Sequence, residues 1–197
     1  MSTRYSLKYS VSEYLDIDHM SDFRHEYLNG EIFAMTGGSI SHIRIREATS
    51  QSLSNQLMDS QCEVLGGDMR VKTEANFYTY PDLVVVCGEA LVEKFEGKET
   101  LMNPKVIIEI LSKSTRNYDK GSKFELYKHI TSFDEYVLID QYQPHIVVYT
   151  KQSDNNWIVT AESKVKDSEI TLSTINCVLA LNHIYRKVEF QQKITKK

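Results

Sequence analysis

Two acidic side chains stand where buried strands would ordinarily carry apolar ones. Glu109 interrupts the apolar run "VIIEIL" (106–111), and Asp82 comes directly before the run "LVVVC" (83–87). An ionised carboxylate is costly to bury unless it is paired, hydrogen-bonded or bound to a cation. Each acid therefore needs a partner, and the kind of partner decides what chemistry the two can perform.

As a pair, the two acids indicate a site for a divalent metal ion. Either one alone is explained as well by a strand-end carboxylate that backbone N–H groups or a basic side chain hold. Carboxylates near the ends of adjacent strands can converge on one point, and such oxygen ligands suit Mg²⁺ or Mn²⁺. A metal ion held by Asp82 and Glu109 would polarise a phosphoryl oxygen and lower the pKa of a bound water, which is hydrolytic chemistry.

Basic residues surround the second acid. Residues 105–128 contain six basic and three acidic side chains, a net charge of +3 in a chain whose formal net charge is −4. Cations beside an acidic pair suit a phosphodiester, because the cations hold the flanking phosphates while the acids hold the metal ion. The candidate nucleic-acid contacts are Lys113, Arg116 and Lys120.

Lys123 is a lysine that could reach the acids. It precedes Tyr127 by four residues and so shares a helical face with a side chain expected to pack on the sheet. A long side chain rooted there can extend along the apolar surface toward Glu109. By spacing alone, a solvated charge on the helix surface is the simpler explanation for Lys123.

The first third of the chain predicts a hairpin and a helix. The segment "HEYLNGEIFAM" (25–35) carries Asn-Gly between two strand-like halves, the strongest short signal for a β-hairpin. This turn puts Glu26 and Glu31 on the same face of the hairpin. Apolar residues at four-residue spacing then predict a helix over about 40–58.

The remaining patterns predict an α/β domain, in which helices and peripheral β-hairpins flank a mixed central sheet. One domain is expected over 1–197, with a short amphipathic N-terminal lead-in at 1–20 and a tail at 187–197. The other expected elements are a strand with a Gly-Gly kink over 62–73, strands over 80–87, 105–111 and 133–141, a loop over 89–103, a helix over 117–130, a hairpin around 153–156 and a packing helix at the end of 169–190.

Composition and charge exclude several classes of protein. The net charge of −4 and the pI near 5.9 give no overall attraction to nucleic acid or to an anionic membrane, so such a contact needs a local patch. No run approaches 18 apolar residues, so a soluble, cytoplasmic protein is expected. The three cysteines lie far apart without a C-x-x-C pair, which argues against a zinc site or a disulfide framework and predicts a buried free thiol at Cys87.

The sequence also resembles a known family. The segments "YPDLVVVC", "PKVIIEILSKSTRNYDKGSKFELYKHI" and "FDEYVLID" look like the Uma-type family of candidate restriction endonucleases, which belongs to the PD-(D/E)XK nuclease superfamily. The resemblance extends over about residues 20–186. It implies a restriction-endonuclease-like fold, a divalent metal ion and cleavage of phosphodiester bonds, most simply in DNA. A homodimer is also implied as a possibility, since superfamily members often pair to cut two strands.

The resemblance assigns roles by position. Asp82 matches the Asp of the PD element, and Glu109 matches the acidic position that follows it. Leu111 occupies the position of the usual lysine, which is a departure from the superfamily pattern. The resemblance implies that the lysine has moved to the following helix, as Lys123 or, second, as Lys120.

Two further residues are carried over more loosely. Glu31 matches a recurrent family acid in the opening hairpin, and His42 matches a recurrent histidine near the first helix. Their expected roles are support of the metal site for Glu31 and positioning of the nucleic acid for His42.

The leading interpretation is a Mg²⁺- or Mn²⁺-dependent endodeoxyribonuclease. Asp82 and Glu109 would bind the metal ion, Lys123 would assist the attacking water, and Glu31 would support the site. A catalytically inactive nucleic-acid-binding or protein-interaction domain of the same fold stays open, and Leu111 is the feature that favours it. A hydrolase of another phosphate ester also stays open, because a fold does not fix a substrate.

Overall fold

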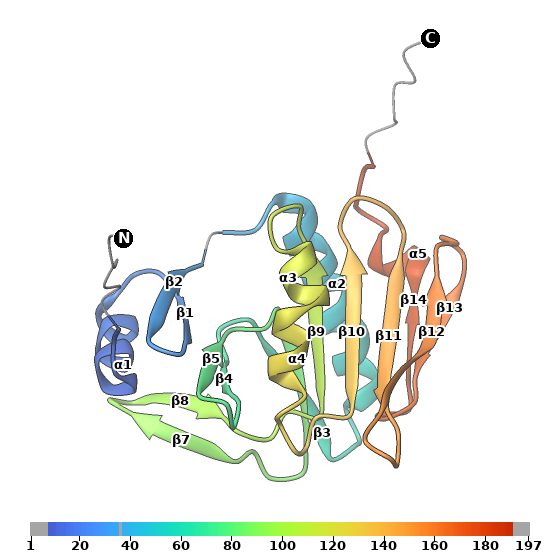
Figure 1. Cartoon of the computed structure of the whole chain (residues 1–197). Helices are drawn as coiled ribbons and strands as arrows, with labels where there is room; N and C mark the ends of the chain where they lie inside the picture. The colour runs from blue at the N-terminus through green and yellow to red at the C-terminus, as the bar shows by residue number, and fades with distance from the viewer. Residues whose placement is uncertain (1–7, 36, 191–197) are drawn as a thin grey trace, which may run out of the picture.

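Two six-stranded sheets organise the computed structural model, which describes residues 8–35 and 37–190 (Figure 1). The first sheet has the strand order β12-β11-β10-β9-β6-β3, and we call it the central sheet. The second sheet has the order β2-β1-β5-β4-β8-β7. None of the described helices is long and apolar enough to cross a membrane.

The central sheet is mixed, as the sequence predicts. Its parallel neighbours β9 and β10 are entirely buried, and helices α3 and α4 make the crossover that a parallel pair requires. All its other neighbouring strands pair in the antiparallel sense. The elements of this region are β3 (Cys62–Gly66), β6 (Leu83–Cys87), β9 (Val106–Leu111), α3 (Arg116–Lys120), α4 (Ser122–Tyr127), β10 (Glu135–Asp140), β11 (Ile146–Lys151) and β12 (Trp157–Ser163).

Different helices pack on the two faces of the central sheet. Figure 1 shows α2 (Ile40–Leu57) on one side of this sheet and α3 and α4 on the other. Because side chains alternate along a strand, Ile108 packs with α2, whereas Ile107 packs with α4. Glu109 has the parity of Ile107 and therefore points to the side of α4. A hairpin and a short helix complete the α2 side: β13 (Glu169–Leu172), β14 (Cys177–Ala180) and α5 (Leu181–Ile184).

The second sheet lies beside the central one and carries the N-terminal helix. Tyr14 of α1 stacks on Tyr27, with ring centroids 5.0 Å apart, and Tyr78 completes a small aromatic core. The elements of this half are α1 (Val11–Met20), β1 (His25–Leu28), β2 (Glu31–Ala34), β4 (Arg70–Lys72), β5 (Phe77–Thr79), β7 (Val92–Phe95) and β8 (Lys98–Leu101).

The predicted hairpin and the predicted long helix are both confirmed. Asn29 and Gly30 form the two-residue turn with φ values of 50° and 92°, the positive angles that a type I′ turn requires. Helix α2 begins after Ser39, whose hydroxyl accepts a hydrogen bond from the backbone N–H of His42 at 3.2 Å. Such an N-cap stabilises the first turn.

Several predicted elements have different bounds in the structure. The stretch 62–73 is two strands, β3 and β4, which belong to different sheets, and the expected loop over 89–103 contains the hairpin β7–β8. The expected helix over 117–130 is divided at Gly121 into α3 and α4. The expected final helix is the hairpin β13–β14 followed by the short α5. Residues 1–7 of the expected lead-in and 191–197 of the expected tail lie outside the described residues.

Cys62 and Cys87 form a disulfide, which corrects the prediction of a free thiol at Cys87. The antiparallel register of β3 and β6 places the two cysteines opposite each other. The adjacent pair, Gln61 and Gly88, is joined by a backbone hydrogen bond of 2.7 Å, so the cysteines occupy a position where paired Cα atoms approach closely. Cys177 is buried and free.

A buried ion pair joins α1 to the second sheet. Asp18 is 1% exposed, and its Oδ2 lies 2.9 Å from Nη1 of Arg70, which is also 1% exposed. Tyr80 donates a hydrogen bond to the same oxygen at 2.5 Å, and the Arg70 Nε donates to Thr100 at 2.8 Å. The N-terminal helix is therefore part of the fold, since its acid neutralises a buried guanidinium.

Replacing Asp18 by Asn should destabilise the protein strongly. The substitution keeps the shape of the side chain but leaves the Arg70 guanidinium buried without a counter-charge, which typically costs about 3–5 kcal/mol. Urea unfolding followed by circular dichroism measures this change in the free energy of unfolding.

The matched control is Glu99→Gln, in the exposed pair that Glu99 forms with Lys94. Exposed ion pairs contribute little, so this variant should unfold like the parent. Equal, small effects of the two substitutions would show that the buried pair does not hold α1 in place.

Candidate active site

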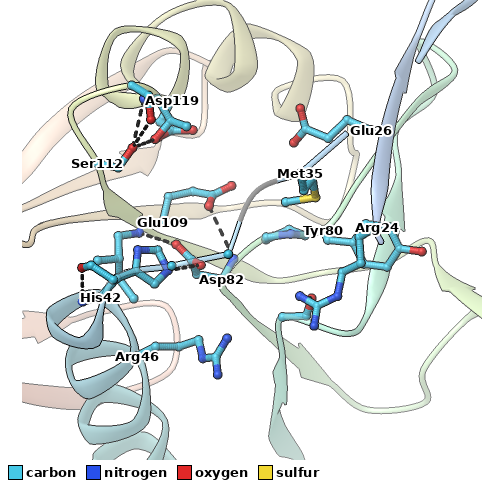
Figure 2. A pocket seen from close by; sticks show the side chains of 18 of the residues that line it. Arg24, Glu26, Met35, His42, Arg46, Tyr80, Asp82, Glu109, Ser112 and Asp119 are labelled. Atoms are coloured by element: carbon cyan, nitrogen blue, oxygen red, sulfur yellow. Dashed lines mark hydrogen bonds and ion pairs between the residues drawn. The ribbon is translucent and has the colours of Figure 1, made fainter. Parts of the chain in front are cut away.

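A cleft of about 600 Å³ opens where the two sheets meet (Figure 2). The residues that line it come from β1, β2, the start of α2, the segment before β6, β9, α3 and α4. The cleft thus lies where segments far apart in the sequence converge, and it contains both acids that the sequence singled out.

Asp82 and Glu109 lie opposite each other at the wall of this cleft. The register pairs Leu83 with Ile108, so the next residues outward, Asp82 and Glu109, face each other across β6 and β9. Paired residues point to the same face of a sheet. The backbone N–H of Asp82 also donates a long hydrogen bond of 3.4 Å to Oε2 of Glu109.

The carboxylate of Asp82 is held from two sides. Its Oδ2 accepts a hydrogen bond from the backbone N–H of Ile110 at 2.7 Å, and its Oδ1 lies 2.7 Å from Nε2 of His42. His42 comes from the first turn of α2, beside Gly38. A Cβ at Gly38 would stand 2.8 Å from the imidazole Cδ2, so glycine leaves the space that the ring needs. His42 is therefore a partner of Asp82 inside the cleft.

Glu109 is buried, and one of its carboxylate oxygens accepts two strong hydrogen bonds. It is 5% exposed, and its Oε1 accepts from the hydroxyl of Tyr127 at 2.7 Å and from Nζ of Lys123 at 2.9 Å. Among the residues that the structure describes, its Oε2 has only the long contact to the backbone of Asp82. Burial raises the pKa of Glu109, and the charge of Lys123 opposes this rise without cancelling it.

Lys123 occupies the centre of the acidic cluster. Its side chain is 5% exposed, and its Nζ lies 3.0 Å from Oε1 of Glu26, 2.9 Å from Oε1 of Glu109 and 3.8 Å from Oδ1 of Asp119. Burial lowers the pKa of Lys123, but these carboxylates raise it more, so its pKa stands well above the usual value. The ammonium group therefore stays charged and cannot accept a proton at neutral pH. Leu111, at the usual lysine position, is packed in the core on the α4 side.

Glu26 is a member of the cluster that the sequence did not single out. It lies in β1, between β2 and β5, and is 7% exposed. Its Oε1 accepts from Thr79 at 2.5 Å and its Oε2 from the hydroxyl of Tyr118 at 3.3 Å. Glu31 shares the hairpin face with Glu26 but lies on the edge strand β2, exposed and outside the lining of the cleft. Of the two acids in the hairpin, Glu26 on the inner strand therefore lines the cleft, and the expected Glu31 does not.

The expected phosphate contacts lie around the cleft rather than in it. Arg116 is paired with Asp140 at 3.0 Å, and Lys113 lies over the ring of Tyr142, with Nζ 5.2 Å from the ring centroid. Lys120 is exposed, and no ion pair joins it to another residue in the described ranges 8–35 and 37–190. Besides Lys123, the described residues that line the cleft include two basic side chains, Arg24 and Arg46.

The residues present fit a magnesium ion. Mg²⁺ is usually bound through one or two carboxylates and keeps several waters, and Asp82 and Glu109 supply two such carboxylates on one wall of the cleft. Within the described part of the chain, no group of three or more His, Cys, Asp and Glu side chains is arranged to hold a metal ion by itself. The donor set thus suits a hard, largely hydrated cation and not a fully enclosed site such as structural zinc.

Replacing Lys123 by Met should destabilise the fold. The substitution keeps the length of the side chain and removes the charge that compensates Glu26 and Glu109, so a loss of about 3–5 kcal/mol in the free energy of unfolding is expected. Denaturant unfolding measures it. Lys120→Met is the matched control on the preceding helix, and it should change the stability little because Lys120 is exposed. A Lys123→Met protein as stable as Lys120→Met would contradict the cluster.

The chain has relatives among known proteins. Two uncharacterised proteins of Synechocystis sp. (strain ATCC 27184 / PCC 6803 / Kazusa) are similar along most of their length. The protein slr1290 is 31% identical over 184 residues, which covers 93% of this chain and 94% of that protein. The protein sll1609 is 34% identical over 167 residues, which covers 83% of this chain and 92% of that protein.

A solved structure has the same fold. It is described as "a putative nuclease belonging to DUF820" from Anabaena variabilis ATCC 29413, and it superposes with a TM-score of 0.70 at 18% identity. The match covers 89% of this chain and 96% of that chain, which establishes the restriction-endonuclease-like α/β fold expected from the sequence. A model of the Uma2 family, whose description is "Putative restriction endonuclease", matches residues 11–180. The chain belongs to the Uma2 family.

Proposed function

We propose that the protein is a metal-dependent nuclease that hydrolyses phosphodiester bonds in DNA. The observation that carries this proposal is the opposition of Asp82 and Glu109 on adjacent strands, with the ammonium of Lys123 2.9 Å from Glu109. Two carboxylates and a cation at one wall of a cleft are the groups that metal-assisted phosphate chemistry needs. Membership of the Uma2 family and the nuclease-like fold support the same reaction class.

Each residue of the cluster has a distinct part in this proposal. Asp82 and Glu109 hold the metal ion, which when bound would supply Lewis acidity at the phosphoryl oxygen and a more acidic water. Lys123 stays protonated and stabilises the negative charge that develops on the phosphate. His42 orients the carboxylate of Asp82, and Glu26 positions the ammonium of Lys123.

Arg24 and Arg46 are proposed to hold the phosphates next to the scissile one. Both arginines line the cleft that contains Asp82, and Figure 2 shows Arg24 beside Tyr80 and Arg46 below Asp82. Their present partners, Asp68 and Glu47, have side chains that are 89% and 63% exposed. Exposed ion pairs are weak, so each arginine can exchange its carboxylate for a phosphate at little cost.

The test is the cleavage of supercoiled plasmid DNA in the presence of Mg²⁺ or Mn²⁺. The parent protein should nick the plasmid, and EDTA should abolish the reaction. Asp82→Asn should reduce the rate by about a hundredfold or more, because an amide binds the cation far more weakly than a carboxylate. Gel electrophoresis of the plasmid forms over time measures the rate.

Glu31→Gln is the control, since Glu31 lies on the same hairpin but outside the cleft. It should cleave at the parental rate. Cleavage that persists in EDTA, or that Asp82→Asn leaves unchanged, would refute the proposal. If the parent protein binds DNA without cutting it under either metal ion, the non-catalytic binding domain becomes the better explanation.

A further inference from the structure

Exposed aromatic side chains are concentrated at the cleft. Among the residues that the structure describes, four aromatic side chains are largely exposed, and three of them line the cleft: Phe23 at 69%, Phe33 at 47% and Tyr142 at 42%. The fourth, Tyr9, lies elsewhere and is 38% exposed. A cluster of exposed apolar groups with polar groups around it marks an interaction site.

The three rings come from separate parts of the chain. Phe23 lies in the turn between α1 and β1, Phe33 lies in β2, and Tyr142 follows β10. Only the folded protein brings them to one cleft, so the cluster is not a by-product of one amphipathic segment. Each exposed phenylalanine also lacks part of the stabilisation of about 1.5–3 kcal/mol that its complete burial would contribute.

Basic side chains lie at the same cleft as these rings. Arg24 and Arg46 line the same cleft, and the Nζ of Lys113 lies 5.2 Å from the ring centroid of Tyr142. Aromatic faces that alternate with basic groups are typical of surfaces that bind single strands, where bases stack on the rings and phosphates contact the cations.

A second protein surface fits this cleft less well. An apolar partner seated on Phe23 and Phe33 would cover the arginines and the acid pair of the same cleft without offering them polar partners. A nucleic-acid strand offers both a π-face for each ring and a phosphate for each cation. The chemistry of the lining therefore favours the strand.

We propose that the cleft accepts an unpaired nucleic-acid strand whose bases stack on Phe23, Phe33 and Tyr142. This inference rests on the proposed nuclease function and specifies its substrate class. In an intact duplex the base faces are stacked on each other and are not available to the rings, so the strand must be single or locally opened. The rings then fix the strand so that a phosphate lies near Asp82 and Glu109.

The experiment measures binding apart from cleavage. Fluorescence anisotropy in EDTA is recorded with labelled oligothymidine, oligouridine and a duplex of equal length, for the parent protein and its variants. The parent should bind the single strands at least about tenfold more tightly than the duplex. Phe23→Ala and Phe33→Ala should each weaken single-strand binding about tenfold. The two oligonucleotides separate DNA from RNA as the source of the unpaired bases.

Two controls separate stacking from general apolar contact. Phe23→Trp keeps an aromatic face and should retain the parental affinity, whereas Phe23→Leu keeps an apolar side chain without that face and should bind as weakly as Phe23→Ala. Tyr9→Ala removes an exposed ring outside the cleft and should change nothing. Circular dichroism of each variant establishes that the fold is retained.

Three results would overturn the inference: equal affinity for duplex and single strand, parental binding by Phe33→Ala, or parental binding by Phe23→Leu. A sedimentation change from dimer to monomer in Phe23→Ala, with unchanged affinity, would assign the rings to contact between two copies and would also overturn it. The binding experiment contains no metal ion, so a negative result in it is distinct from a negative result in the plasmid-cleavage assay. A protein that cleaves duplex DNA but shows no single-strand preference would keep the proposed function and lose this inference.

Discussion

The buried ammonium group of Lys123 is the interaction on which the site and the meeting of the two sheets depend. It lies 3.0 Å from Glu26 of the second sheet and 2.9 Å from Glu109 of the central sheet. Two ionised carboxylates from separate sheets repel each other when they are buried, and the ammonium group between them offsets this repulsion. The same cation also lines the cleft that contains Asp82. Structural support and chemistry are thus supplied by one side chain.

Local sequence patterns predicted the elements that carry the acids. The apolar runs around Asp82 and Glu109 are continuous enough to identify two buried strands, and the four-residue spacing over 40–58 identifies α2. The Asn-Gly turn fixes the register of the hairpin, because few residues tolerate positive φ at both positions. Helical spacing puts Lys123 on the same face as Tyr127, but by spacing alone a solvated surface charge is the simpler explanation. The structure instead buries the Lys123 side chain, with its Nζ 2.9 Å from Glu109.

The features that the sequence did not predict depend on which strands lie next to each other in the folded protein. Glu26 and Glu31 share a face, and only the position of β1 inside the second sheet decides that Glu26 reaches the cleft. The Cys62–Cys87 disulfide likewise follows from the pairing of β3 with β6 across 25 residues. Arg24 lies in the turn before β1 of the second sheet, and it lines the cleft because this turn contacts the segment after β3 of the central sheet. The hydrophobic periodicity of a strand indicates which side chains share a face, but it does not indicate which strands pair with it.

The most direct test of the account is anomalous diffraction from crystals grown with Mn²⁺. The account predicts one strong anomalous peak between the carboxylates of Asp82 and Glu109, in the cleft that both residues line. Crystals of Glu109→Gln prepared in the same way should lose that peak. If the parent crystals show no anomalous density at these carboxylates, the two acids have structural roles alone, and the metal-dependent chemistry assigned to them is wrong.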